Sequence, residues 1–102
     1  MNKKIFVTGA SGFAGKLLTK YLERKNFKVT KAVLKNLKHK KNIKIDLTKK
    51  IYLKENFNWI IHTAAYHKIK DFESKPTLKA KKNILMVKNL IDFAKKNKIK
   101  NF

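Results

Sequence analysis

The sequence has 102 residues, no cysteine, and a formal net charge of +21 that comes from 27 basic and 6 acidic side chains. This length fits one small domain, and the lack of cysteine excludes disulfides, thiolate nucleophiles and cysteine-ligated metals. No apolar run approaches the ~20 residues of a membrane span and the N-terminus shows no signal-peptide pattern, so we expect a cytoplasmic protein with no membrane partner.

The positive charge taken alone is typical of proteins that bind nucleic acids. Only Arg24 among the basic residues is an arginine, however. Lysine lacks the planar guanidinium group with which arginine forms bidentate hydrogen bonds to guanine and phosphate. The lysines are spread along the chain and accompany many asparagines and isoleucines, a joint bias that an A/T-rich genome produces. We therefore expect a solvated lysine coat that binds nucleic acid only nonspecifically and in a salt-sensitive way.

Strand and helix patterns alternate from the N-terminus. Residues 4–7 form a β-rich run that leads into three closely spaced glycines, and helical periodicity follows from Phe13 to Arg24. The apolar residues of this helix recur every four positions and predict a stripe that packs on a sheet. They are Phe13, Leu17 and Tyr21, together with Ala14, Leu18 and Leu22. Strands are predicted next over residues 28–34 and 43–45, on either side of a lysine-rich loop.

The second half continues the alternation. A short, weakly helical stretch is predicted around residues 48–57, and a buried strand over 59–63 with Trp59 in the core. The longest helix is predicted over 77–97, with Pro76 tolerated in its first turn. Its apolar face would comprise Ile84, Val87, Leu90, Ile91 and Ala94. Residues 99–102 then predict the opening of a fifth strand.

This alternation predicts an α/β fold, a Rossmann-like doubly wound parallel sheet of order 3-2-1-4-5 that is truncated at the start of the fifth strand. We expect one incomplete domain over residues 1–102, since no repeat, linker or internal boundary is visible. The apolar helix near the C-terminus and the free sheet edge predict either self-association or a missing C-terminal half that covers them.

The glycines at positions 9, 12 and 15 lie between the first strand and the first helix. Gly9 can take the positive φ of a tight turn, Gly12 lets the backbone approach a pyrophosphate, and Gly15 lets the helix lie close to the strand. The start of the helix adds N–H donors and the positive end of its dipole. The turn therefore predicts a dinucleotide-binding site.

Four segments resemble one family, the extended short-chain dehydrogenases or NAD-dependent epimerases/dehydratases. Thr8-Gly9-x-x-Gly12-x-x-Gly15 resembles the family's glycine turn, and Asp46-Leu47-Thr48 its Asp-Leu pair near the adenine. Residues 59–65 resemble its fourth strand, and 83–91 its Asn-x-x-Gly-Thr-x-Asn-Leu-Leu helix, although Met86-Val87 replaces the usual Gly-Thr. The four segments occur in the family's order.

The resemblance implies the NAD(P)-binding N-terminal portion of an epimerase, dehydratase or reductase. Glu73-x-x-Pro76 is also similar to the branch that modifies nucleotide-activated sugars, such as 4,6-dehydratases. The small residues after the fourth strand would lie against the ribose and nicotinamide. The complete set of predicted cofactor-binding residues is Thr8, Gly9, Ser11, Gly12, Phe13, Ala14, Gly15, Lys35, Asp46, Leu47, Thr63, Ala64, Ala65 and Asn83.

The preference between NAD and NADP depends on the end of the second strand, where a carboxylate binds a ribose 2′-hydroxyl and a basic group accepts a 2′-phosphate. No Asp or Glu occurs from Lys25 to Ile45, and Lys35 or Lys38 could meet a phosphate. The sequence therefore favours NADP slightly over NAD.

We assign no catalytic residue and no metal site. The family's tyrosine and the lysine four residues later come after the fifth strand, and this sequence ends at Phe102. Two Tyr-x-x-x-Lys matches occur earlier, at Tyr21 in the first helix and at Tyr66 one crossover too early, and His62 fits a core or strand-end role. We expect a chain that binds the cofactor but is inactive alone. The alternatives are a non-enzymatic dinucleotide-binding module and a basic nucleic-acid-associated protein.

Overall fold

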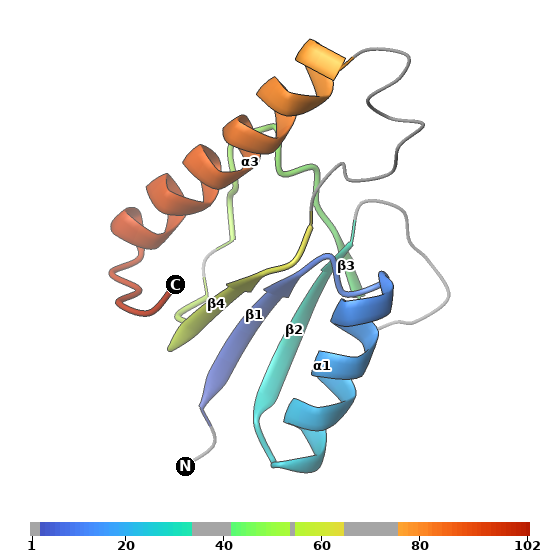
Figure 1. Ribbon diagram of the computed structural model, residues 1–102. Helices are drawn as coiled ribbons and strands as arrows, with labels where there is room; N and C mark the ends of the chain where they lie inside the picture. Colours follow the sequence, from blue (N-terminus) through green and yellow to red (C-terminus); the bar gives the residue numbers. More distant parts are fainter. Residues whose placement is uncertain (1–2, 34–41, 54, 65–75) are drawn as a thin grey trace.

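Four parallel strands form the centre of the protein (Figure 1). The computed structural model describes residues 3–33, 42–53, 55–64 and 76–102. The strands are β1 (Lys4–Thr8), β2 (Lys28–Val33), β3 (Asn42–Lys44) and β4 (Trp59–His62), in the order β3-β2-β1-β4. The helices are α1 (Phe13–Arg24) and α3 (Pro76–Lys96). Each of these elements begins and ends within one or two residues of its predicted position.

The sheet also has the start of a fifth strand beside β4. Asn101 forms an isolated parallel bridge with Trp59, and the backbone N–H of Ile60 donates to the carbonyl of Asn101 at 2.9 Å. The predicted Rossmann-like order, with an incomplete fifth strand, is thus confirmed.

The core is divided by the sheet into two clusters. Successive side chains of β1 point to opposite faces, so Phe6 enters one cluster while Ile5 and Val7 enter the other. The larger cluster lies under α3 and centres on three rings, with Phe6 5.1 Å from Phe57 and 5.7 Å from Phe93 between centroids. The smaller cluster lies under α1. The two helices therefore cover opposite faces of the sheet (Figure 1).

The prediction for the packing face of α1 is partly wrong: of the six predicted residues, Leu22 is buried and Leu18 packs partly against the smaller cluster, but the others do not join the core. Phe13 is 85 % exposed and Leu17 and Tyr21 are each 56 % exposed, whereas Gly15, Thr19 and Leu22 are buried. Gly15 lies against the turn that follows β1, so the helix face that carries Gly15, Thr19 and Leu22 packs on the sheet. The line of Phe13, Leu17 and Tyr21 therefore faces outward.

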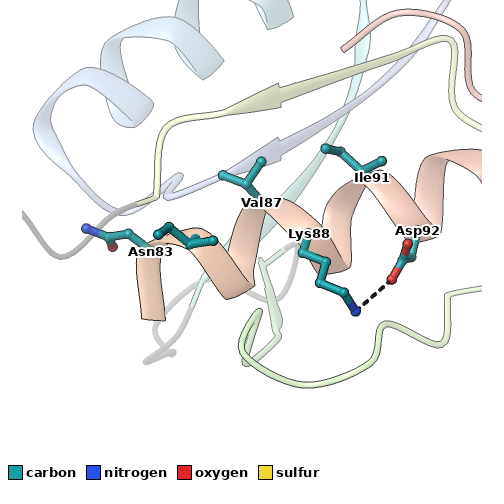
Figure 2. A pocket seen from close by; sticks show the side chains of 6 residues that line it. Asn83, Val87, Lys88, Ile91 and Asp92 are labelled. Atoms are coloured by element: carbon teal, nitrogen blue, oxygen red, sulfur yellow. Dashed lines mark ion pairs between the residues drawn. The ribbon is translucent and has the colours of Figure 1, made fainter. Parts of the chain in front are cut away.

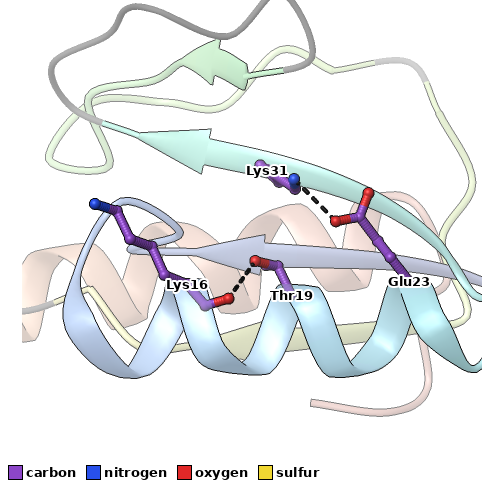
Figure 3. Close-up of polar contacts among 4 residues, drawn as sticks. All are labelled: Lys16, Thr19, Glu23 and Lys31. Carbon is purple, nitrogen blue, oxygen red and sulfur yellow. Dashed lines mark hydrogen bonds and ion pairs between the residues drawn. The ribbon is translucent and has the colours of Figure 1, made fainter.

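Polar contacts are consistent with this orientation of α1 (Figure 3). The buried hydroxyl of Thr19 donates to the carbonyl of Lys16 at 3.1 Å, so it is not left unpaired against the sheet. Glu23 Oε1 lies 3.0 Å from Lys31 Nζ and joins the end of α1 to β2.

The predicted core faces of α3 and β4 are partly wrong. Leu90 and Ala94 are buried as expected, but the helix packs mainly through the neighbouring Met86 and Phe93. The predicted core residues Ile84, Val87 and Ile91 are exposed at 70, 37 and 41 %, and Trp59 at 41 %. Phe93 fixes this rotation because it joins the ring cluster, and the Asn89 side-chain amide donates to the Leu47 carbonyl at 2.8 Å on the same side.

The weak helix predicted around residues 48–57 is absent from the described part of that segment. A turn follows Asp46, and the chain then crosses the larger cluster, where Ile51 and Phe57 are buried and Leu53 packs against them. Tertiary burial of these widely spaced apolar side chains outweighs the weak helical preference. No helix among the described residues is both long and apolar enough to span a membrane.

Candidate functional site

The predicted binding residues gather at one edge of the sheet, because parallel strands all end there. The glycine turn follows β1, Asp46 and Leu47 follow β3, and Thr63 and Ala64 follow β4. The turn and the end of β4 are in direct contact. Lys35 and Ala65 lie outside the described residues.

Gly9 and Gly15 are required by the fold itself. Gly9 has a φ of +66°, and a Cβ there would lie 2.7 Å from both the Ala64 nitrogen and the Thr63 Oγ1. A Cβ on Gly15 would overlap the Gly9 carbonyl oxygen and lie 2.9 Å from the Ala10 Cα. Apart from Thr63 Oγ1, these contacts are made by backbone atoms, so a side chain at either position would displace the turn.

Gly12 is different, because the surrounding protein does not require a glycine there. Its φ of −76° and ψ of 173° are extended backbone that any residue adopts. A Cβ at this position would meet only the Gly9 carbonyl oxygen, at 3.4 Å, which is ordinary contact. Gly12 is exposed, as are Ser11, Phe13 and Ala14. The lack of a side chain therefore keeps open a space in front of the helix.

The start of α1 is suited to an anion. Gly12 is the N-cap, it makes no side-chain capping bond, and the first turn contains no acidic residue. The first N–H groups of a helix have no partner within the helix and carry the positive end of its dipole. Gly12, which precedes these groups, adds no side chain beside them.

A single hydroxyl joins β1 to the end of β4. Thr8 is fully buried, and its Oγ1 accepts the backbone N–H groups of Thr63 at 3.1 Å and Ala64 at 3.3 Å. The same Oγ1 lies 2.7 Å from His62 Nδ1. In return, the Thr63 hydroxyl donates to the Thr8 carbonyl at 2.5 Å. These bonds hold the residues after β4 against the glycine turn.

This network favours one protonation state of His62. The Thr8 hydroxyl accepts two backbone N–H groups, that of Thr63 being shared with the Thr8 carbonyl, so its one hydrogen is available to His62 Nδ1. This arrangement corresponds to a neutral ring with its hydrogen on Nε2. Burial also lowers the pKa of His62 from its ordinary value of 6.5.

We expect His62 to make the protein less stable in mild acid. The pKa of His62 is lower in the folded than in the unfolded chain, so the unfolded chain binds more protons. The contribution of His62 to the free energy of unfolding is therefore fully present above pH 6.5 and is lost as the pH falls below that value. Thermal melts between about pH 7.5 and 5.5 would measure this loss. His62→Asn keeps an acceptor for Thr8 but cannot titrate, and should give a flatter profile. Equal slopes for both proteins would contradict the assignment.

Asp46 stabilises the turn after β3. Its Oδ1 accepts the Thr48 hydroxyl at 2.6 Å and the Thr48 backbone N–H at 3.0 Å. The side-chain hydrogen bond from Thr48 holds the pKa of Asp46 below its ordinary value of 3.8. Asp46 is exposed where the chain leaves β3, and its contact with an adenine stays a prediction.

The remaining described candidates differ in accessibility. The Leu47 side chain is buried in the larger cluster, so only its backbone is available at the edge. Ala64 packs partly against that cluster, and Asn83 is half-buried on the first half of α3. A cofactor role for Leu47, Ala64 and Asn83 stays a prediction.

Comparison with known proteins was made at the level of sequence and of structure. Residues 5–102 match the sequence profile described as the NAD dependent epimerase/dehydratase family. This chain belongs to that family. A search of curated proteins found no match.

Solved structures show the same fold over nearly the whole of this chain. L-threonine dehydrogenase from Clostridium difficile is 27 % identical with a TM-score of 0.83, and the match covers 99 % of this chain and 35 % of that one. The enzyme of the same name from Phytophthora infestans is 22 % identical with a TM-score of 0.80, over 97 % and 34 %. UDP-glucose 4-epimerase from Thermus thermophilus, solved in complex with NAD, is 19 % identical with a TM-score of 0.76, over 95 % and 35 %. The chain thus spans about a third of the length of these structures.

Sequence reasoning missed the bond between Thr8 and His62. His62 is expected to be a satisfied core or strand-end histidine rather than a catalytic one; it is half-buried at the end of β4 with its ring on Thr8, a partner that the expectation does not name. A signal did exist, because Thr8 and His62 are the last residues of their strands and face each other in the parallel register of β1 and β4.

Proposed function

We propose that this member of the epimerase/dehydratase family binds NAD or NADP along the carboxyl edge of its sheet, with the pyrophosphate on the turn from Gly9 to Gly15. The observation that carries the proposal is Gly12. The fold requires glycine at the other two positions, whereas at Gly12 it leaves an open space before an uncapped helix. A pyrophosphate would accept the free N–H groups and needs that space.

The rest of the dinucleotide would extend from this point in two directions. We place the adenine toward Asp46 and the backbone of Leu47, and the ribose and nicotinamide toward Thr63, Ala64 and Asn83. Thr8 would act as a positioning residue, because it holds the end of β4 against the turn. A slight preference for NADP remains part of the proposal and rests on the absence of acidic residues between Lys25 and Ile45.

Catalysis is proposed to require residues that this chain does not supply. Tyr21, which starts one Tyr-x-x-x-Lys match, lies eight residues into α1, or ~12 Å along the helix from the turn at 1.5 Å per residue. Its ring lies under Lys25 Nζ, 5.8 Å from ring centroid to Nζ, and is more than half exposed. We propose that a full-length relative of this chain acts on a nucleotide-activated sugar in the cytoplasm.

Titration with NADH and NADPH tests the proposal directly. We expect saturable binding that weakens only a few-fold between about 50 and 200 mM salt, because the ligand brings few charges. A single-stranded DNA oligonucleotide is the control, and its affinity should fall by orders of magnitude over the same range. Added UDP-, GDP- or dTDP-sugars should cause no loss of NADH absorbance. A steep decline of the NADH affinity, like that of DNA, would contradict a built cofactor site.

A further inference from the structure

The hydroxyl of Thr8 uses its full hydrogen-bonding capacity, and one of its partners can change its charge. Thr8 Oγ1 accepts the backbone N–H groups of Thr63 at 3.1 Å and Ala64 at 3.3 Å. It also lies 2.7 Å from His62 Nδ1. A hydroxyl has two acceptor lone pairs and one hydrogen. These three contacts are therefore satisfied together only while His62 Nδ1 carries no hydrogen.

Protonation of His62 would disrupt this arrangement. A charged imidazolium ring donates from both nitrogens, so Nδ1 would become a third donor to an oxygen with two lone pairs. The N–H of Thr63 has a second acceptor, the Thr8 carbonyl oxygen at 3.3 Å. Among the described residues the N–H of Ala64 has no acceptor besides Thr8 Oγ1, and its bond is the longer of the two. The bond from Ala64 is therefore the one that would be lost.

Ala64 lies directly against the glycine turn. A Cβ on Gly9 would come within 2.7 Å of the Ala64 nitrogen and 2.8 Å of the Ala64 Cα. The nitrogen that meets Gly9 is thus the same atom whose N–H is held by Thr8 Oγ1. Binding sites depend on such supporting contacts, because small displacements of the surrounding backbone weaken the fit to a ligand. Release of Ala64 would therefore alter the wall that faces the turn.

No charged neighbour among the described residues sets the protonation of His62. Burial lowers the pKa of His62 and is the only cause of that shift. None of the ionisable side chains on β1, on the first half of α3 or on the chain after α3 contributes to it; these are Lys4, Lys79, Lys81, Lys82, Lys98 and Lys100. Further along α3, Lys88 Nζ and Asp92 Oδ2 pair with each other at 3.5 Å (Figure 2). The state of Nδ1 thus depends on burial and on the hydrogen bond with Thr8.

We propose that His62 is a positioning residue for the cofactor, because its unprotonated Nδ1 accepts the Thr8 hydroxyl and leaves both lone pairs of that hydroxyl to hold the end of β4 against the glycine turn. This inference rests on the proposed function. The form without the proton binds the cofactor better, so binding should weaken in acid and should itself lower the pKa of His62. A positive ring that attracted the phosphates directly would have the opposite effect on both.

Nuclear magnetic resonance titration of His62, with and without saturating NAD, measures this coupling in the unmodified protein. We expect the pKa of His62 to be lower in the NAD-bound than in the free protein. His39 and His67 supply the control resonances, and their pKa values should shift less. NAD is preferred to NADPH as the probe because a 2′-phosphate itself titrates at about pH 6.

Calorimetric titration with NAD between about pH 7.5 and 5.5 gives a second readout. The affinity should fall a few-fold and by no more than about tenfold, because one linked proton changes affinity by at most tenfold per pH unit below 6.5. Buffers of different ionisation enthalpy should reveal proton release on binding. His62→Asn should abolish both the acid dependence and the proton release, whereas His39→Asn combined with His67→Asn should keep them. Circular dichroism at each pH would verify that the protein is folded.

The outcomes separate this inference from the proposed function. An unchanged or raised pKa of His62 in the NAD-bound protein would overturn the inference alone. Acid dependence that persists in His62→Asn would also overturn it and would assign the dependence to another group. Failure of the unmodified protein to bind NAD at about pH 7.5 would overturn the proposed function and this inference with it.

Discussion

Replacing Gly15 with alanine should lower the free energy of unfolding by about 3 kcal/mol, at the upper end of the usual cost of overpacking. A glycine-to-alanine change within a helix ordinarily stabilises by roughly 0.5–1 kcal/mol, so the expected sign is reversed. The reason is the contact of Gly15 with the Gly9 carbonyl oxygen and the Ala10 Cα, backbone atoms that cannot move without distorting the turn.

Urea unfolding followed by circular dichroism measures the effect of Gly15→Ala. Gly12→Ala is the matched control, since its Cβ would meet only one atom, at 3.4 Å, and should change stability by no more than about 1 kcal/mol. If the Gly15 variant is as stable as the unmodified chain, α1 does not approach the turn as closely as the structure shows.

Replacing Gly12 with valine should weaken NADH and NADPH binding by about a hundredfold or more, while costing only about 1 kcal/mol of stability. The branched side chain would fill the space in front of α1 and keep a pyrophosphate from the N–H groups of the first turn. It is tolerated by the fold because the backbone of Gly12 is extended and exposed.

Calorimetric titration of Gly12→Val, together with its unfolding curve, separates loss of the site from loss of the fold. Leu17→Val changes an exposed residue one turn further along α1 and should bind the cofactor normally. Unchanged affinity in the Gly12 variant would show that the dinucleotide, if bound, does not use this turn.

The order of elements could be predicted well because strands and helices differ in hydrophobic periodicity, and because glycines, Pro76 and Asp46 mark some of their ends. The rotation of the helices could be predicted less well. Periodicity finds apolar lines on a helix but does not say which line faces the sheet when there are two. On α1 the decisive residue is Gly15, since the face that approaches most closely must carry the smallest side chain.

On α3 the choice depends on contacts between residues far apart in sequence. Phe93 joins Phe6 and Phe57, and Asn89 binds the Leu47 carbonyl, and neither contact has a local signature. The residues after Asp46 were interpreted as weakly helical for the same reason, because their true partners lie in the ring cluster. The candidate site was easier to predict, since its residues follow strand ends and topology alone brings them together.

The hydroxyl of Thr8 also makes the proposed binding site depend on a contact between distant parts of the chain. Its partner His62 is 54 residues away along the chain, and the entropy of closing so long a loop must be overcome before β1 and β4 pair. Until then the turn after β1 has no opposing wall, because Thr63 and Ala64 have not yet reached it. The proposed binding site is therefore formed only when β4 has paired with β1, and a ligand bound there would stabilise that pairing.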